Sequence, residues 1–419
     1  MSTGLCASHP RLAAQFEEDW DSPLGEYGKR LFQSEPLSLD PDFLGLVQNQ
    51  ARQIGYPEDW IDRLCRQLCK SPVIQTSHHS TPTHGPTFTA IDLITLSGLD
   101  TEAIYPIFAT SGVPFSNSAW SGALSYGSLG LDQLFATGSP ALTKATKAQA
   151  EREAHGGQEA RLSLIGAKWR DHLVFSADQS ESLAPLLNQL HPNVQPLLAP
   201  VRLGQPWSHW AAKTASLIQG KLFGKKVMVL DMSVLVADYV ALKLKQGDPL
   251  FLELLSDPVS QGTLDFLVPY RGKKSFKVNR ASWDGGRLCC EKAGPTVEGV
   301  EGLAAALAAR ELCPAVWTSF FVLRFVLGLK CLGSFNQVGY LENFRLQLLD
   351  SKLTPHLQLD AQVDDLTTGR LFGPDGKPVW PLDQVLSGQQ LSVDNFKDCR
   401  MSTFWEPVVR QLKSALSGR

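Results

Sequence analysis

The sequence predicts an α/β protein with a mostly parallel β-sheet, and three observations support this prediction. Short stretches rich in β-branched and aromatic residues, at 72–76 and 104–110, indicate strands. Apolar residues at helical spacing follow the first of them, at 87–96. The chain of 419 residues is 43% hydrophobic, which is enough apolar material for one large core or two moderate ones. Because strands that alternate with helices are joined by crossovers, parallel pairing is favoured.

The predicted core spans residues 71–348 and lies between two flanking segments. Residues 1–70 form a predicted helical lead-in, because its apolar residues, among them Leu64, recur at three- and four-residue spacing. Residues 349–419 are richer in Asp, Thr, Gly and Pro and form a predicted small C-terminal appendage. Its Asp-Gly dipeptide at 375–376 is typical of a tight hairpin turn.

The remaining elements of the core are predicted from apolar runs, helical spacing and clusters of turn residues. Apolar runs that pass into helical spacing predict a buried strand and a helix, whereas clusters of Gly, Pro and Asn predict turns. In chain order the further predicted elements are a solvated loop at 139–158, a strand at 172–177, a strand and helix at 225–239, a helix at 298–310, a buried helix at 315–329 and a glycine turn at 332–340.

Composition and charge argue against several classes of protein. The formal net charge is -3, so no overall basic field favours nucleic acid as the main partner. The N-terminus has no basic segment followed by an apolar one, which predicts a cytoplasmic protein. The most apolar run, 315–329, contains Arg324 and is too short to cross a membrane. The eight cysteines are scattered and are expected to be reduced thiols.

The loop at 76–86 is the first candidate for a working site, because it holds three of the nine histidines between a predicted strand and a predicted helix. A loop that enters a helix presents free backbone N–H groups and the positive end of the helix dipole. We therefore expect the loop to bind phosphate or carboxylate at Gly85. The imidazoles of His78, His79 and His84 would stabilise charge there during catalysis.

Other interpretations of this region stay open. Three histidines suit zinc or iron, although no Glu-x-x-His pattern completes a metal site. The same Ser, Thr and His residues also suit a polar loop that caps a helix. A Ser/His/Asp hydrolase could use His172 with Asp171 or Asp178, but the chain has no Gly-x-Ser-x-Gly elbow.

Three further polar segments are candidates for ligand contacts. In a parallel sheet, the cluster at 110–120 would share the carboxyl edge with the histidine loop, where ligands bind. Carboxamides at 336–337 could fix a polar end of the ligand, and the loop at 271–275 is similar to the lysine-serine loop of class I adenylate-forming synthetases. Ordinary turns, a helix cap and a basic surface loop are the alternatives. The candidates are Ser111, Ser116, Asn117, Trp120, Asn336, Gln337 and Tyr340 for substrate, and Lys273 and Lys274 for phosphate.

Three segments together resemble the bacillithiol biosynthesis cysteine-adding enzymes. They carry a polar loop that reaches Gly-Pro, a strand that ends in an active-site loop, and a buried segment followed by a glycine turn and an aromatic residue. Gly85, Pro86, Gly333 and Tyr340 match the family's motifs residue by residue, whereas His78-His79 stands where the family has Gln-Gln. The segments are 76–96, 104–117 and 312–340.

The resemblance implies a Rossmann-like core related to class I synthetases, with binding of ATP or ADP. It also implies that the protein is a small-molecule biosynthetic enzyme that forms an amide between an amino acid and an amine-bearing substrate. We expect no metal cofactor, no nucleic-acid partner and no membrane association, and the oligomeric state stays open. The competing hypotheses are a metal-dependent oxygenase or hydrolase with histidine ligands, and a non-catalytic protein that binds a small ligand.

Overall fold

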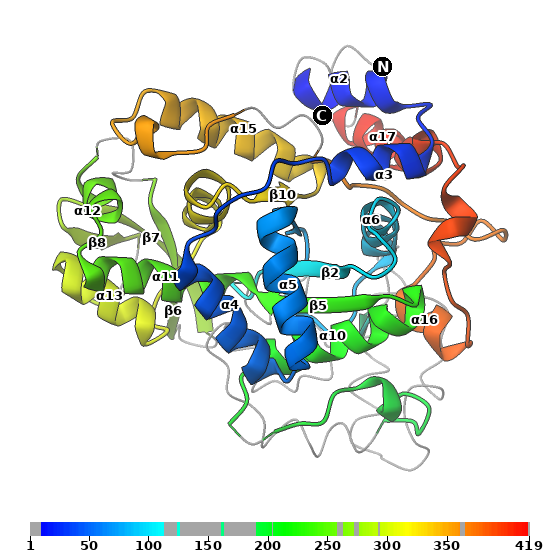
Figure 1. The fold of residues 1–419 in the computed structure, drawn as a ribbon, viewed down its shortest axis with the longest axis horizontal. Helices are drawn as coiled ribbons and strands as arrows, with labels where there is room; N and C mark the ends of the chain where they lie inside the picture. The colour runs from blue at the N-terminus through cyan, green and yellow to red at the C-terminus, as the bar shows by residue number, and fades with distance from the viewer. Residues whose placement is uncertain are drawn as a thin grey trace.

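The computed structural model contains two four-stranded sheets and a large number of helices (Figure 1). Its first strands and helices are α2 (Pro10–Asp19), α3 (Leu24–Leu31), α4 (Pro41–Ile54), α5 (Glu58–Lys70), β1 (Val73–Gln75), α6 (Pro86–Leu96) and β2 (Ile104–Ala109). The residues that the structure describes are 10–112, 124–125, 161–162, 190–202, 204–257, 263–271, 276–291, 294–360 and 365–417.

The central sheet is parallel throughout, so the predicted Rossmann-like α/β core is confirmed. Its strand order is β10-β1-β2-β5, with β5 at Lys226–Asp231 and β10 at Lys330–Leu332. Every residue of β1, β2 and β10 is buried, as expected for parallel strands covered on both faces. The predicted strands at 72–76 and 104–110, and the strand at the start of 225–239, are therefore confirmed.

Local sequence signals explain where the core helices begin and end. Helix α6 begins with Pro86 in its first turn and Gly85 as N-cap. Helix α11 (Met232–Gln246) begins where the Asp231 carboxylate accepts a hydrogen bond from the Val234 N–H, and it ends at Gly247 with φ +69. Figure 1 shows α4 and α5 crossing one face of the parallel sheet.

A second, antiparallel sheet stands beside the parallel one and was not predicted. Its strand order is β8-β7-β6-β9. The turn between β7 and β8 consists of Gly285 and Gly286, which both have positive φ, as a two-residue hairpin of this kind requires. The strands are β6 (Asp265–Arg271), β7 (Phe276–Asp284), β8 (Arg287–Cys290) and β9 (Cys313–Pro314), and a two-stranded pair is formed by β3 (Leu124–Ser125) and β4 (Arg161–Leu162).

One predicted element is wrong in type. The glycine turn predicted at 332–340 is the end of β10, a two-residue link and the first part of helix α15 (Phe335–Leu349). The predicted helix at 298–310 is α13 (Gly299–Ala308), and the buried run at 315–329 is α14 (Val316–Phe320) continued by a π-helical turn at Phe321–Val326. The predicted loop at 139–158 and strand at 172–177 lie outside the described residues.

The C-terminal segment packs on the N-terminal helices, which Figure 1 shows side by side. The Trp405 ring lies 4.8 Å from that of Phe16 and 5.4 Å from that of Tyr27. A separate C-terminal appendage is therefore not confirmed, although Gly376 does make the predicted tight turn, with φ +74. The remaining helices are α10 (Trp207–Phe223), α12 (Pro249–Ser256), α16 (Pro381–Leu386) and α17 (Met401–Ser417), with short 3-10 turns at Gln195–Leu197, Thr354–His356 and Val393–Phe396.

The described helices and cysteines bear on two of the expectations from the sequence. None of the helices in the described ranges is long and apolar enough to cross a membrane. The seven cysteines that fall within those ranges are all free thiols.

Candidate functional site

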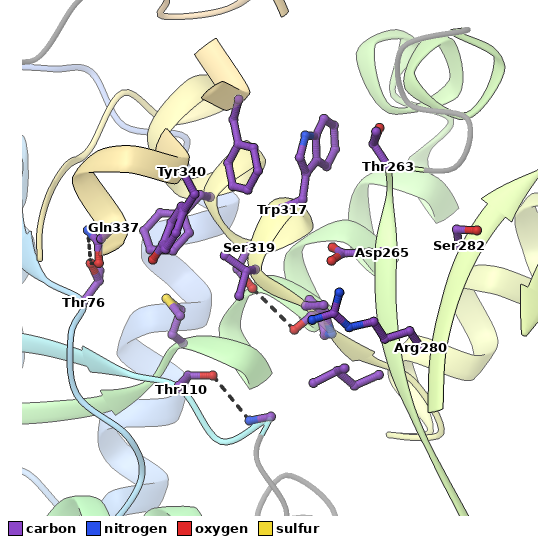
Figure 2. A pocket seen from close by; sticks show the side chains of 18 of the residues that line it. Thr76, Thr110, Thr263, Asp265, Arg280, Ser282, Trp317, Ser319, Gln337 and Tyr340 are labelled. Atoms are coloured by element: carbon purple, nitrogen blue, oxygen red, sulfur yellow. Dashed lines mark hydrogen bonds between the residues drawn. The ribbon is translucent and has the colours of Figure 1, made fainter. Parts of the chain in front are cut away.

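A cavity of about 690 Å³ lies where all four parallel strands end (Figure 2). Each strand places at least one residue in its wall at or just beyond its carboxyl end. These residues are Thr76 after β1, Thr110 after β2, Met232 after β5 and Ser334 after β10. Ligands of open α/β sheets bind at this edge, and the volume falls in the range of small-molecule sites.

The cavity lies at the point of the parallel sheet where the strand order reverses. The chain runs from β1 to β2 to β5 in one direction and then returns to place β10 on the other side of β1. Across this point Gln337 Nε2 donates hydrogen bonds to Thr76 Oγ1 at 2.8 Å and to the Cys331 carbonyl at 3.0 Å. The Thr76 hydroxyl in turn donates to the Leu332 carbonyl at 2.9 Å. Gln337 therefore joins the two strands at the switch point and forms part of the cavity wall.

The opposite wall is one face of the antiparallel sheet. The strand register places Asp265 opposite Ser282, and Ser282 opposite Cys289, so that one row of polar side chains crosses three strands. Arg280 precedes Ser282 by two residues and therefore shares its face. All four residues line the cavity, and Figure 2 shows the Asp265 carboxylate and the Arg280 guanidinium on this side of it.

Asp265 is a half-buried carboxylate with one oxygen engaged by the protein. Its Oδ1 accepts a hydrogen bond from the Thr318 N–H at 3.2 Å, at the start of the short helix α14. Burial raises the pKa of Asp265, and the hydrogen bonds from Thr318 and the charge of Arg280 offset part of this effect. Within the described part of the chain, no ion pair is formed by either Asp265 or Arg280.

Aromatic rings from α14 and α15 form a third wall. The rings of Phe320 and Tyr340 lie 5.5 Å apart, and those of Tyr340 and Phe344 also lie 5.5 Å apart. Trp317 approaches Phe344 at 6.4 Å and stacks on Phe321 behind it at 5.1 Å. Trp317, Phe320, Tyr340 and Phe344 line the cavity, and together they are called the aromatic wall below.

Two buried polar atoms on lining residues have no hydrogen-bond partner among the described residues. They are the Ser77 hydroxyl and the indole N–H of Trp317. Because an unsatisfied buried polar group costs about 1–3 kcal/mol, such atoms are rare in native structures.

Of the three predicted histidines, only His79 lines the cavity. Its backbone pairs with Thr110 across the ends of β1 and β2, and its carbonyl lies 3.0 Å from His84 Nε2. Burial, reinforced by the neighbouring His78, lowers the pKa of His79 to about 3. The imidazole is therefore neutral at physiological pH. It can polarise a carbonyl oxygen by a hydrogen bond, but it is too weak a base to remove a proton from an ammonium group.

His78 and His84 lie on the other side of this loop, against helix α6. His78 Nε2 is 3.0 Å from Asp92 Oδ1, which also accepts a hydrogen bond from the Tyr105 hydroxyl at 2.7 Å. The His84 ring packs on Phe88 at 4.5 Å and on His78 at 4.9 Å. Neither side chain lines the cavity, so the structure separates His79 from the two histidines that were grouped with it.

The other predicted site residues are also divided. Gln337 and Tyr340 line the cavity, whereas Asn336 is exposed on α15 and does not. Ser111 is buried and donates a hydrogen bond to Asp231 at 2.7 Å, and Gly85 caps α6 away from the cavity wall. The remaining predicted residues, which lie outside the described ranges, are Ser116, Asn117, Trp120, Lys273 and Lys274.

Sequence reasoning missed the most strongly charged part of the site. Asp265 and Arg280 come together only through the register of β6 and β7, and nothing local marks either residue. The Asp-Gly-Gly-Arg sequence at 284–287 was the usable signal, because it is typical of a hairpin and would have revealed the antiparallel sheet.

The residues described here offer little support for a metal centre. No group of three or more His, Cys, Asp or Glu side chains in these ranges is arranged to hold a metal ion. His78, His79 and His84 are close in sequence but do not form such a group. The hypothesis of a histidine-ligated oxygenase or hydrolase therefore gains no support from this loop.

Replacing His79 by Gln is expected to make the protein less sensitive to acid. The pKa of His79 is about 3 when folded and near 6.5 when unfolded, so the unfolded chain binds more protons between these values. This contribution to stability is present above pH 6.5 and is lost as the pH falls, by at most about 1.4 kcal/mol per pH unit. We expect the free energy of unfolding in urea to fall less for His79→Gln than for the wild type between pH 6.5 and about 4.5.

The exposed His356 provides the control for this measurement. His356→Gln should follow the wild type over the whole pH range. Equal acid sensitivity of His79→Gln and the wild type would show that His79 is not held neutral by its surroundings.

No protein-family model matches this chain, and no curated protein matches it. The resemblance to the cysteine-adding enzymes therefore stays a prediction. The proposed function therefore rests on the residues that line the cavity.

Proposed function

We propose that the protein is a small-molecule enzyme that joins the carboxyl group of an amino acid to an amine, with its active site in the cavity at the end of the parallel sheet. One observation carries this proposal: a single cavity brings a carboxylate, a guanidinium and a neutral imidazole to facing walls. An amino acid and the carbonyl of a forming amide need these groups.

Each group has a defined task in this reaction. Arg280 holds a carboxylate by paired hydrogen bonds, and Asp265 holds an ammonium group. His79 donates a hydrogen bond to the carbonyl oxygen, which gains negative charge as the amine nitrogen attacks. The C–N bond forms, the phosphate that activated the carboxyl leaves with its electron pair, and the proton lost by the amine passes to that phosphate. We propose ATP as the source of the activating phosphate, by analogy with the Rossmann-like fold.

The test is a search for product formation. The purified protein is incubated with pools of L-amino acids and primary amines, with and without ATP and Mg²⁺, and amide products are identified by mass spectrometry. We expect an amide whose formation requires the native protein and consumes ATP. An amino acid that binds without any product, with every amine pool, would instead support the non-catalytic binding protein.

A further inference from the structure

We infer that the cavity selects an α-amino acid with an aromatic side chain, held by its ammonium group at Asp265, its carboxylate at Arg280 and its ring at the aromatic wall. This inference rests on the proposed function and names the substrate class for it. The two charged residues and the rings come from different elements, so each part of the ligand can be tested separately.

The charged side chains of Asp265 and Arg280 lie on the same face of the antiparallel sheet. Asp265 pairs with Ser282 across β6 and β7, and Arg280 is two residues from Ser282, so Asp265 and Arg280 are diagonal neighbours on one face of the sheet. They are close enough for the charge of Arg280 to lower the pKa of Asp265, yet they form no ion pair with each other within 4.0 Å. A zwitterion, whose opposite charges lie a few ångströms apart, can bridge such a pair.

Both charged side chains keep atoms that are available to a ligand. Asp265 Oδ1 is held by the Thr318 N–H, which fixes the carboxylate in place and leaves Oδ2 for a ligand. Arg280 is exposed, and its planar guanidinium matches a carboxylate with two parallel hydrogen bonds. The pair therefore has one free acceptor for an ammonium group and a set of donors for a carboxylate.

The aromatic wall provides the surface for a ligand ring. Figure 2 shows Trp317 and Tyr340 on the side of the cavity across from Arg280 and Ser282. Tyr340 and Phe344 are half-buried and present ring surface to the cavity, whereas Phe320 and Trp317 are only 2% and 4% exposed and support them. Aromatic pairs gain more than their buried area alone provides, so a ligand ring is favoured here over a short aliphatic side chain. One side of the cavity thus suits the charged groups of a zwitterion, and the opposite side suits an aromatic ring.

The experiment is isothermal titration calorimetry of the full chain with four ligands. L-phenylalanine carries all three features, L-alanine lacks the ring, 3-phenylpropanoate lacks the ammonium group and 2-phenylethylamine lacks the carboxylate. We expect L-phenylalanine to bind at least about tenfold more tightly than each of the other three. Removing one ring of the aromatic wall, by Phe344→Ala, should reduce the difference in affinity between L-phenylalanine and L-alanine.

Two substitutions then assign the charges. Arg280→Gln should remove the contribution of the carboxylate, so that L-phenylalanine binds no more tightly than 2-phenylethylamine. Asp265→Asn should remove that of the ammonium group, so that L-phenylalanine binds no more tightly than 3-phenylpropanoate. The matched control is Arg287→Gln, an exposed arginine on the same sheet that does not line the cavity, which should leave all four affinities unchanged.

The possible failures are distinguishable. Equal affinity for L-alanine and L-phenylalanine would overturn the aromatic selectivity and leave the proposed amide-forming function standing. If an amino acid binds with equal affinity to the wild type and to both charge variants, the assignment of Asp265 and Arg280 is overturned here and in the proposed function, whereas an amide product would still show that the protein joins an amino acid to an amine. If no amino acid binds at all, the inference and the proposed function both fail.

Discussion

Replacing Gly98 by Ala is expected to lower the free energy of unfolding by about 3 kcal/mol or more. Gly98 follows α6, where the chain passes against Gly28 of helix α3. A Cβ atom at Gly98 would overlap the backbone carbonyl of Gly28, and one at Gly28 would lie 2.6 Å from the Gly98 nitrogen. Because both partners are backbone atoms, no side-chain rotation relieves the overlap, and α3 has to move away from the core.

Gly45 provides the matched control for this substitution. It lies inside helix α4, and an added Cβ would meet no atom within 4 Å. Gly45→Ala should therefore stabilise the protein, by about 0.5–1 kcal/mol, through the higher helix propensity of alanine. Urea unfolding followed by circular dichroism measures both variants. If Gly98→Ala were as stable as Gly45→Ala, the close packing of α3 against the end of α6 would be incorrect.

Replacing Asp265 by Asn is expected to reduce kcat/KM for amide formation by about 10- to 100-fold, as expected for the loss of a hydrogen bond between charged groups. Asparagine keeps an oxygen that can accept the Thr318 N–H, but it lacks the negative charge that holds the ammonium group. The loss should therefore appear mainly as a higher KM for the amino acid. Product formation at varied amino-acid concentration, quantified by mass spectrometry, measures it.

Stability separates this effect from misfolding. Because burial raises the pKa of Asp265, the charged carboxylate costs stability at neutral pH, and Asp265→Asn should be at least as stable as the wild type. Asp375→Asn is the control, since Asp375 lies in an exposed turn, where it accepts the Lys377 N–H at 3.0 Å and forms an exposed ion pair with Lys377 Nζ at 3.8 Å. A fully active Asp265→Asn enzyme would remove Asp265 from the site.

The parallel core could be predicted because its signals are local. Strands β1 and β2 are short apolar runs with turn residues after them, β5 is an apolar run that passes directly into helix α11, and α6 begins with Gly85-Pro86, which is a strong helix-start signal. Strand β10 has only three residues, and these lie between the predicted buried helix at 315–329 and the predicted glycine turn that begins at 332, so no strand was predicted there. The Ser-x-x-Gln spacing of Ser334 and Gln337 is that of a capping box and was the usable signal for the start of α15, although the Ser334 side chain makes no capping hydrogen bond.

The site was predictable only in part, for a physical reason. The histidine loop was located correctly at the carboxyl end of β1, and Thr76, Ser77 and His79 do line the cavity. Sequence spacing could not show that His78 turns towards Asp92, because α6 folds back over the loop. Residues on β6 and β7 line the cavity because the antiparallel sheet packs beside strands that are far away in the sequence, and local sequence patterns do not predict such contacts.

The central claim, that this cavity is the ligand site, is tested most directly by the alkylation rate of Cys289. Its thiol lines the cavity, whereas Cys399, which is also half-buried, does not. Peptide mass spectrometry follows iodoacetamide labelling of both cysteines with and without L-phenylalanine and ATP. We predict that the ligands slow the labelling of Cys289 and leave that of Cys399 unchanged. An unchanged rate at Cys289, at ligand concentrations that raise the melting temperature, would place the ligand elsewhere and contradict this account.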